Sequence, residues 1–202
     1  MKSYKSVVQD RYETESTEEN DSIYSPNSQI GKYSRKVIFR SLKSILDRFS
    51  NEKGNLTILD VGCGKGTLVD FFLSEGFTEK NIYGIDLSSN RINQAKTKYP
   101  SVNFVNGDAL ELTDITTEFD VITTFDLYSH FISKEEIIKG LKAISSKLKD
   151  TGTFIWYDIN TADHFSPPSN IDSWGFSMEQ MKSLGKEAGF EVVKSQGLFK
   201  LF

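Results

Sequence analysis

The sequence is poor in cysteine and in histidine. Its 202 residues include one cysteine, Cys63, and two histidines, His130 and His164. A single cysteine excludes a disulfide within the chain, which favours a cytoplasmic location, where thiols stay reduced. Two histidines 34 residues apart form no ligand cluster, so the sequence predicts no metal site.

The sequence also lacks long apolar runs and an excess of basic residues. No run approaches the roughly 20 apolar residues of a membrane-spanning helix, so we expect a soluble protein without a membrane partner. The lysines near the N-terminus are not followed by the apolar stretch of a signal peptide. The formal net charge is -4, whereas polyanion-binding surfaces are usually basic. Nucleic acid is therefore a poor candidate for a partner.

Residues 1–33 differ in pattern from the rest of the chain. They are polar, they lack apolar periodicity, and several tyrosines are spread along them. This composition predicts an N-terminal arm that packs loosely when no ligand is bound. The tyrosines are compatible with a lid that closes over a ligand, and equally with simple anchors on the domain. Residues 34–202 form the predicted domain.

Short strand patterns alternate with longer helical patterns through the predicted domain. The predicted strands are 56–61, 81–86, 102–105, 119–124, 153–158 and 190–193. The predicted helices are 34–49, 67–74, 89–98, 133–148 and 177–189. Such alternation implies right-handed crossovers and a mostly parallel sheet covered on both faces, which is a doubly wound α/β fold. The apolar tail at residues 198–202 is compatible with a short antiparallel last strand.

A glycine-rich loop follows the first predicted strand. Gly62, Gly64 and Gly66 come directly after Asp60 and Val61. Glycines at such a turn let backbone N–H groups approach a ligand closely. Dinucleotide-binding domains use a related loop, Gly-x-Gly-x-x-Gly, but Thr67 stands at the position of its third glycine. The loop alone leaves two classes of nucleoside cofactor open.

Two further loops carry a carboxylate after a predicted strand. Asp86 ends the second strand, where a carboxylate can accept hydrogen bonds from both hydroxyls of a ribose. A cap for the following helix is the alternative role. Gly107, Asp108 and Ala109 follow the third strand, where a carboxylate and an N–H group can reach the edge of an adenine ring. Three such loops in this order are more specific than one.

Four segments resemble the motifs of the class I S-adenosylmethionine-dependent methyltransferases. Residues 58–67 resemble their first motif, residues 83–88 the acidic motif, residues 106–109 the adenine motif and residues 119–122 the strand-four motif. The resemblance covers residues 35–195. It implies a Rossmann-like domain that binds S-adenosylmethionine and releases S-adenosylhomocysteine.

The resemblance also implies a role for each residue of the cofactor site. The glycine loop would surround the methionine part of the cofactor, Asp60 would lie near its amino group, and Leu87 would pack on the adenine. Arg35 could pair with the cofactor carboxylate, although a solvated surface role is an equal alternative. The expected cofactor-binding residues are Asp60, Gly62, Cys63, Gly64, Gly66, Asp86, Leu87, Asp108, Ala109, Thr124, Phe125 and Arg35.

Polar residues after the fourth and fifth strands are the candidates for activating a methyl acceptor. His130 has an intrinsic pKa suited to removing a proton near neutrality. The alternative, which the sequence favours, is that His130 packs beneath the loop and forms a hydrogen bond with a backbone group. Tyr128 and Asp158 are the other candidate catalytic residues. Residues 124–127 read Thr-Phe-Asp-Leu instead of Asn/Asp-Pro-Pro-Tyr, which disfavours adenine and glutamine as acceptors. We expect O- or N-methylation of a small molecule, such as a sugar or a polysaccharide precursor.

Two other functions remain open at this point. A catalytically silent cofactor-binding subunit is compatible with the sequence, because no acceptor-site residue is compelling. A nicotinamide-dependent oxidoreductase is disfavoured by Thr67 and by the lack of an obvious Tyr-x-x-x-Lys pair. The sequence is compatible with a monomer or a homodimer.

Overall fold

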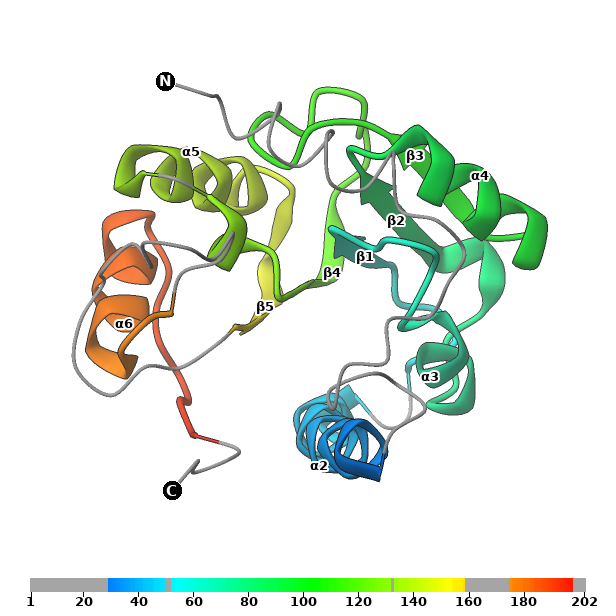
Figure 1. Cartoon of the computed structure of the whole chain (residues 1–202), viewed down its shortest axis with the longest axis horizontal. Helices are drawn as coiled ribbons and strands as arrows, with labels where there is room; N and C mark the ends of the chain where they lie inside the picture. The colour runs from blue at the N-terminus through cyan, green and yellow to red at the C-terminus, as the bar shows by residue number, and fades with distance from the viewer. Residues whose placement is uncertain (1–28, 50–51, 132, 159–174, 198–202) are drawn as a thin grey trace.

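Five parallel strands form the centre of the protein in a computed structural model (Figure 1). The structure describes residues 29–49, 52–131, 133–158 and 175–197. The strands are β1 (Ile58–Val61), β2 (Ile82–Asp86), β3 (Asn103–Asn106), β4 (Phe119–Phe125) and β5 (Leu148–Tyr157). They lie in the order β3-β2-β1-β4-β5, and each neighbouring pair is parallel. This arrangement confirms the predicted doubly wound α/β fold.

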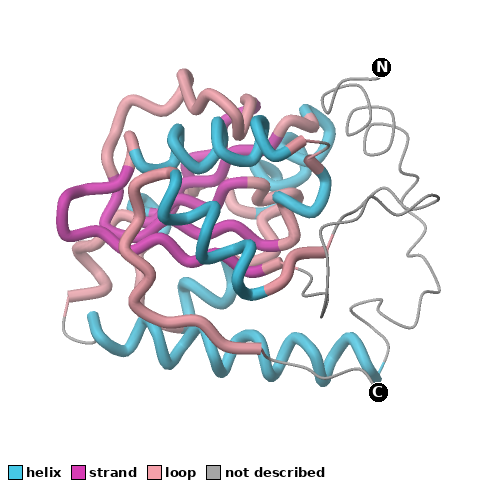
Figure 2. Tube along the Cα trace, turned by 90° about the vertical axis from the view of Figure 1, so that its left-hand side faces the viewer, coloured by secondary structure: helices cyan, strands magenta, loops and turns pink. Residues whose placement is uncertain are grey.

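Helices cover both faces of the sheet. They are α2 (Gln29–Leu46), α3 (Val69–Ser74), α4 (Ser89–Lys98), α5 (Lys134–Ser145) and α6 (Met178–Glu187). One apolar core joins the sheet to α2, α3 and α4, and a second joins it to α5 and α6. Figure 2 shows the long helix α2 running beneath the strands. Strand β1 is buried along its whole length, as expected for a parallel strand between two helical layers.

Serine residues begin three of the helices. The hydroxyl groups of Ser88, Ser133 and Ser177 each accept a hydrogen bond from a backbone N–H in the first turn. At the start of α6 the side-chain oxygen of Gln180 also accepts a hydrogen bond from the N–H of Ser177, which completes a capping box. These caps fix the starts of α4, α5 and α6 close to the residues that the sequence predicted.

The largest differences from the prediction concern α2, α5 and the last predicted strand. Helix α2 begins at Gln29, so it extends across the predicted boundary between arm and domain. Helix α5 ends at Ser145, and the residues before and after Gly152 belong to β5. The predicted strand 190–193 is not formed: residues 191–197 are exposed and lie in no strand, because they bury no apolar face.

Parts of two other predictions lie outside the described residues. These are the arm up to residue 28 and the antiparallel last strand at residues 198–202. Among the helices that the structure describes, none is long and apolar enough to cross a membrane.

Candidate functional site

The glycine loop connects β1 to α3 at the carboxyl end of the sheet. Gly62, Gly64 and Gly66 have φ angles of 79°, 53° and 78°, in the left-handed region that residues with a Cβ rarely adopt. The N–H groups of Gly62 and Cys63 donate to the carbonyl oxygen of Ile85 over 2.8 and 3.1 Å. The loop is therefore held tightly against the end of β2.

Asp86, the last residue of β2, ties the glycine loop to the start of α4. One of its carboxylate oxygens accepts a hydrogen bond from the N–H of Gly64 at 2.8 Å, and the other accepts one from the N–H of Ser88 at 2.9 Å. Ser88 is the N-cap residue of α4, so Asp86 does not have that role. A carboxylate has about four acceptor sites, so the half-buried Asp86 can also accept hydrogen bonds from a ribose.

Asp60 lies beneath the glycine loop as a buried carboxylate. Its side chain is 6% exposed, and the hydroxyl of Thr123 on β4 donates to it at 2.9 Å. Burial raises the pKa of Asp60 to about 7, and the negative charge of Asp86 adds to the rise. Two carboxylates beside one loop suit a ligand that carries positive charge.

Cys63 contributes backbone to the loop while its thiol is buried in the sheet. The sulfur packs against Gly84 on β2, where an added Cβ would lie only 2.8 Å from it. Burial raises the pKa of the Cys63 thiol well above its ordinary value, and the charges of Asp60 and Asp86 act in the same direction. The thiol is therefore no nucleophile at neutral pH.

The loop after β3 is joined to the loop after β2. The side-chain amide of Asn106 donates to the carbonyl oxygens of Asp86 and Leu87 at 3.0 and 2.9 Å, and the N–H of Gly107 donates to Asp86 at 3.1 Å. Asp108 accepts a hydrogen bond from the backbone of its own turn, and Ala109 is buried. The structure thus brings the three predicted loops together at one edge of the sheet.

The carboxyl ends of β4 and β5 form the other side of this edge. Thr124 is fully buried, and the ring of Phe125 stacks on that of Tyr157 with 5.3 Å between the centroids. Burial raises the pKa of Tyr157 to about 12, with the charges of Asp126 and Asp158 adding to the rise. Its phenol is therefore protonated at neutral pH and is no general base.

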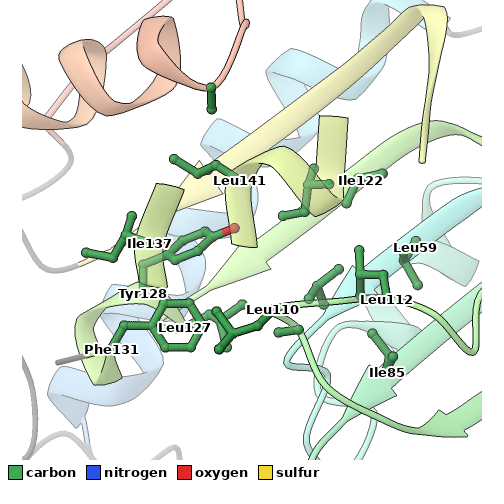
Figure 3. Close-up of a cluster of buried hydrophobic side chains, with 14 of the residues drawn as sticks. Leu59, Ile85, Leu110, Leu112, Ile122, Leu127, Tyr128, Phe131, Ile137 and Leu141 are labelled. Atoms are coloured by element: carbon green, nitrogen blue, oxygen red, sulfur yellow. The ribbon is translucent and has the colours of Figure 1, made fainter. Parts of the chain in front are cut away.

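Tyr128 does not reach this edge with its side chain. The residue is 0% exposed and packs against Phe131 and Trp156, with ring centroids 5.1 Å away in each case. Figure 3 shows its ring beside Ile137 and Leu141 of α5 and Phe131. The structure therefore places Tyr128 in the apolar core.

Asp158 contacts the backbone of the short 3-10 helix η3 (Tyr128–His130), which follows β4 and ends at His130. Asp158 is 7% exposed and accepts hydrogen bonds from the backbone N–H groups of Tyr128 and Ser129. Burial raises the pKa of Asp158 to about 7, and the charge of Asp126 contributes. His130 is half-buried at the end of η3. Of the three predicted catalytic residues, His130 is the least buried.

Two arginines differ in their relation to the glycine loop. Arg35 lies half-buried on α2, and no contact within the described chain joins it to the loop. Arg91 on α4 was not predicted, yet its guanidinium lies 3.8 Å from the position of a Cβ on Gly64. The sequence feature that could have indicated this position is that Arg91 lies in the first turn of the helix after Asp86. Among the described residues no group of three or more acidic, histidine or cysteine side chains gathers as a metal site.

Known proteins match this chain across the loops just described. The family described as a methyltransferase domain matches residues 58–152. A putative methyltransferase of Invertebrate iridescent virus 6 is 29% identical over 151 residues, which cover 72% of this chain and 55% of the viral protein. The chain thus spans little more than half the length of that relative.

Solved structures of similar fold include two methyltransferases. The magnesium protoporphyrin IX methyltransferase of Synechocystis, with bound S-adenosylmethionine, matches 98% of this chain and 94% of its own at a TM-score of 0.66 and 16% identity. The sugar N-methyltransferase KedS8 of Streptoalloteichus matches 65% of this chain and 53% of its own at a TM-score of 0.51 and 18% identity. At these identities the likeness shows the fold.

The sequence motifs, the strand order and the matched domain agree with one another. The matched residues begin at β1 and include the glycine loop, Asp86 and the turn after β3. The family resemblance is thereby confirmed. The matched methyltransferase domain and the fold agree with the predicted resemblance to the class I S-adenosylmethionine-dependent methyltransferases.

Proposed function

We propose that this protein transfers the methyl group of S-adenosylmethionine to a nitrogen or oxygen atom of a small-molecule acceptor. The observation that carries the proposal is the convergence of the glycine loop, Asp86 and the Asp108 turn at one edge of the sheet, above the buried Asp60. The cofactor carries two positive charges, on its sulfonium and its amino group. Two carboxylates beside the loop complement those charges.

Each part of the cofactor is assigned a partner in this chain. The backbone at Gly62 and Gly64 would lie against its methionine part, and Asp60 would receive the amino group. Asp86 would accept the ribose hydroxyls, and the turn at Asp108 would read the adenine edge. Two observations support this fit. The glycines of the loop have positive φ angles and carry no Cβ that would keep a ligand away from the backbone. The carboxylate of Asp60 accepts a hydrogen bond from the hydroxyl of Thr123, which leaves further acceptor sites for the amino group.

The sulfonium makes the methyl group electrophilic, so the cofactor supplies the reactive group. The protein supplies alignment of the acceptor with that group, which is worth roughly 7 to 11 kcal/mol in the best intramolecular systems. The ends of β4 and β5 would provide the acceptor site, with the stacked rings of Phe125 and Tyr157 as an apolar wall. His130 would remove a proton where the acceptor needs one.

Sugars and related metabolites are the acceptor class that we favour. The segment Thr124 to Leu127 lacks the motif of adenine- and glutamine-methylating enzymes. The name of KedS8 states that this fold serves N-methylation of a sugar in another protein. A subunit that binds the cofactor without turnover is the second candidate, since neither Tyr128 nor Asp158 offers a free side chain to an acceptor.

Calorimetry with S-adenosylmethionine, S-adenosylhomocysteine and NAD tests the cofactor assignment. We expect the first two to bind and NAD not to bind. Tight binding of NAD alone would overturn the assignment. A mass-spectrometric screen for methylated products should then include amines, amino sugars, sugar hydroxyls and phenols, and turnover with one class would exclude the silent subunit.

The affinity for S-adenosylhomocysteine should depend on pH through Asp60. Burial raises the pKa of its carboxyl to about 7, and only the ionised form attracts the ammonium group of the ligand. Acidification through this pKa therefore weakens binding, by about tenfold or more between pH 7.5 and pH 5.5. Calorimetry across this range measures the slope. Asp60→Asn should flatten it, and an equal slope in both proteins would contradict the role of Asp60.

Replacement of His130 by alanine separates its two possible roles. If the imidazole is a general base, turnover should fall by about 100-fold or more while the affinity for the cofactor stays within twofold. The cofactor loops make no described contact with His130, so binding has no reason to change. A drop in melting temperature with unchanged turnover would assign His130 a structural role instead.

A further inference from the structure

One carboxylate ties the connection after β4 to the end of β5. The first N–H groups of a helix lack partners within that helix, and Leu127, the N-cap residue of η3, has no polar side chain to supply one. Asp158 supplies the partners from another strand. It accepts from the N–H of Tyr128 at 2.9 Å and from the N–H of Ser129 at 3.2 Å.

The chemistry of this contact calls for a carboxylate. The indole N–H of Trp156 also donates to Asp158, at 3.1 Å, so three N–H donors converge on its two oxygens. An ionised carboxylate accepts at about four sites and carries no hydrogen, whereas an asparagine would turn an NH₂ group toward these donors. Tyr128 and Ser129 are buried, so water cannot take the place of the lost acceptor.

The segment held in this way leads to the candidate base. His130 is the last residue of η3, and its N–H donates to the carbonyl of Leu127 at 3.1 Å. On the other side, Asp126 has a φ angle of 50° and its N–H donates to the carbonyl of Tyr157 at 3.0 Å. The backbone leading to His130 is thus attached to β5 and the residue after it at two successive points.

We propose that Asp158 is a positioning residue for methyl transfer, whose carboxylate holds the backbone of Tyr128 and Ser129 and thereby places the imidazole of His130 at the acceptor site. The inference rests on the proposed function, because it assigns Asp158 a task in the same acceptor site. Asp158 neither touches the acceptor nor exchanges a proton with it. It acts through the backbone of η3.

Asp120 provides a matched control at the opposite edge of the sheet. Its carboxylate accepts from the backbone N–H and the hydroxyl of Thr57, each at 2.9 Å, and pairs with Lys149 at 2.8 Å. It therefore links β4 to β5 and to the residue before β1, whereas Asp158 links η3 to the end of β5. Asp120 lies near the start of β4, at the end of the sheet away from the glycine loop. Its described hydrogen bonds involve Thr57 and Lys149 and not η3.

The experiment compares Asp158→Asn and Asp120→Asn with the unaltered chain by NMR. Amide exchange at residues 128 and 129 should become about tenfold faster or more in Asp158→Asn, because the buried N–H groups lose their acceptor. The imidazole titration of His130, assigned with the help of His164→Gln, should shift in Asp158→Asn. Asp120→Asn should change neither signal, even if its melting temperature falls.

Unchanged exchange and an unchanged His130 titration in Asp158→Asn would overturn the proposal. Equal shifts in both variants would also overturn it, because they would reflect general destabilisation. Calorimetry with S-adenosylhomocysteine should give the same Kd for Asp158→Asn and the unaltered chain within about twofold, since the described hydrogen bonds of Asp158 come from Tyr128, Ser129 and Trp156 and not from the three cofactor loops.

The outcomes also separate this proposal from the proposed function. If the unaltered chain binds no S-adenosylhomocysteine, the proposed function fails, while the NMR comparison still decides whether Asp158 holds His130. With an acceptor in hand, Asp158→Asn should lower kcat by about tenfold or more at unchanged KM for the cofactor. Asp158→Glu, which restores a carboxylate, should recover part of that loss, and a loss confined to KM for the cofactor would contradict the assignment.

Discussion

Asp86→Ala is expected to weaken the binding of S-adenosylmethionine by about 2 to 4 kcal/mol, or roughly 30- to 700-fold in Kd. The substitution removes the carboxylate that would accept hydrogen bonds from the two ribose hydroxyls. The substitution would also leave the N–H of Gly64 without the carboxylate oxygen to which it donates at 2.8 Å. The loss thus combines a missing ligand contact with a less ordered glycine loop. Calorimetry measures the change in Kd.

Asp86→Asn distinguishes the two contributions. The amide oxygen can still accept from Gly64 or from Ser88, so the loop stays partly tied, but the charge is gone and one acceptor becomes a donor. Its affinity should lie between those of the alanine variant and the unaltered chain. Asp120→Ala is the control, because that carboxylate lies at the far edge of the sheet. A folded Asp86→Ala variant with unchanged affinity would refute the ribose assignment.

The cofactor loops could be predicted from the sequence because their chemistry is local. Gly62 and Gly64 stand where a turn from strand to helix needs positive φ angles, and both have them. Asp86 ends a strand, so its carboxylate had to lie at the same sheet edge as the loop after β1. Parallel strands bring their carboxyl ends together regardless of the details of packing. The order of the loops along the chain was therefore sufficient.

The acceptor side depends on packing, which the sequence does not display. Tyr128 and Asp158 both stand just after a strand, and by that criterion either could face a ligand. Tyr128 instead turns toward α5, where Gly140 leaves room for its ring. Asp158 turns toward the backbone of η3. Which way a side chain points after the last residue of a strand is decided by contacts between elements far apart in the sequence.

The errors in strand boundaries have a related cause. Residues 190–193 have the composition of a strand, but a strand forms only where a neighbouring strand offers hydrogen bonds, and no described strand pairs with this segment. The segment from Leu148 to Gly152 looked like the end of a helix followed by a turn. In the structure Leu148 is paired with Phe119 on β4, so tertiary pairing overrides the helical pattern.

Tyr128→Ala is expected to lower the free energy of unfolding by about 3 to 5 kcal/mol, the range for removal of a large buried aromatic ring. The ring is 0% exposed and makes edge contacts with Phe131 and Trp156. It also fills the space beside Gly140, where an added Cβ would lie 3.1 Å from the ring. Urea denaturation measures the loss, which is a large part of the stability of an ordinary domain.

Tyr128→Phe is the matched variant, because it keeps the ring and removes only the hydroxyl. The unfolding free energy of the Tyr128→Phe variant should fall by about 1.5 kcal/mol at most, the upper value for one hydrogen bond. Cofactor affinity and turnover should stay close to those of the unaltered chain, since the hydroxyl is buried among α5 side chains and cannot reach an acceptor. Lost turnover in a Tyr128→Phe variant of unchanged stability would restore Tyr128 as a catalytic residue. The pair of variants therefore decides whether the tyrosine after β4 serves the core or the chemistry.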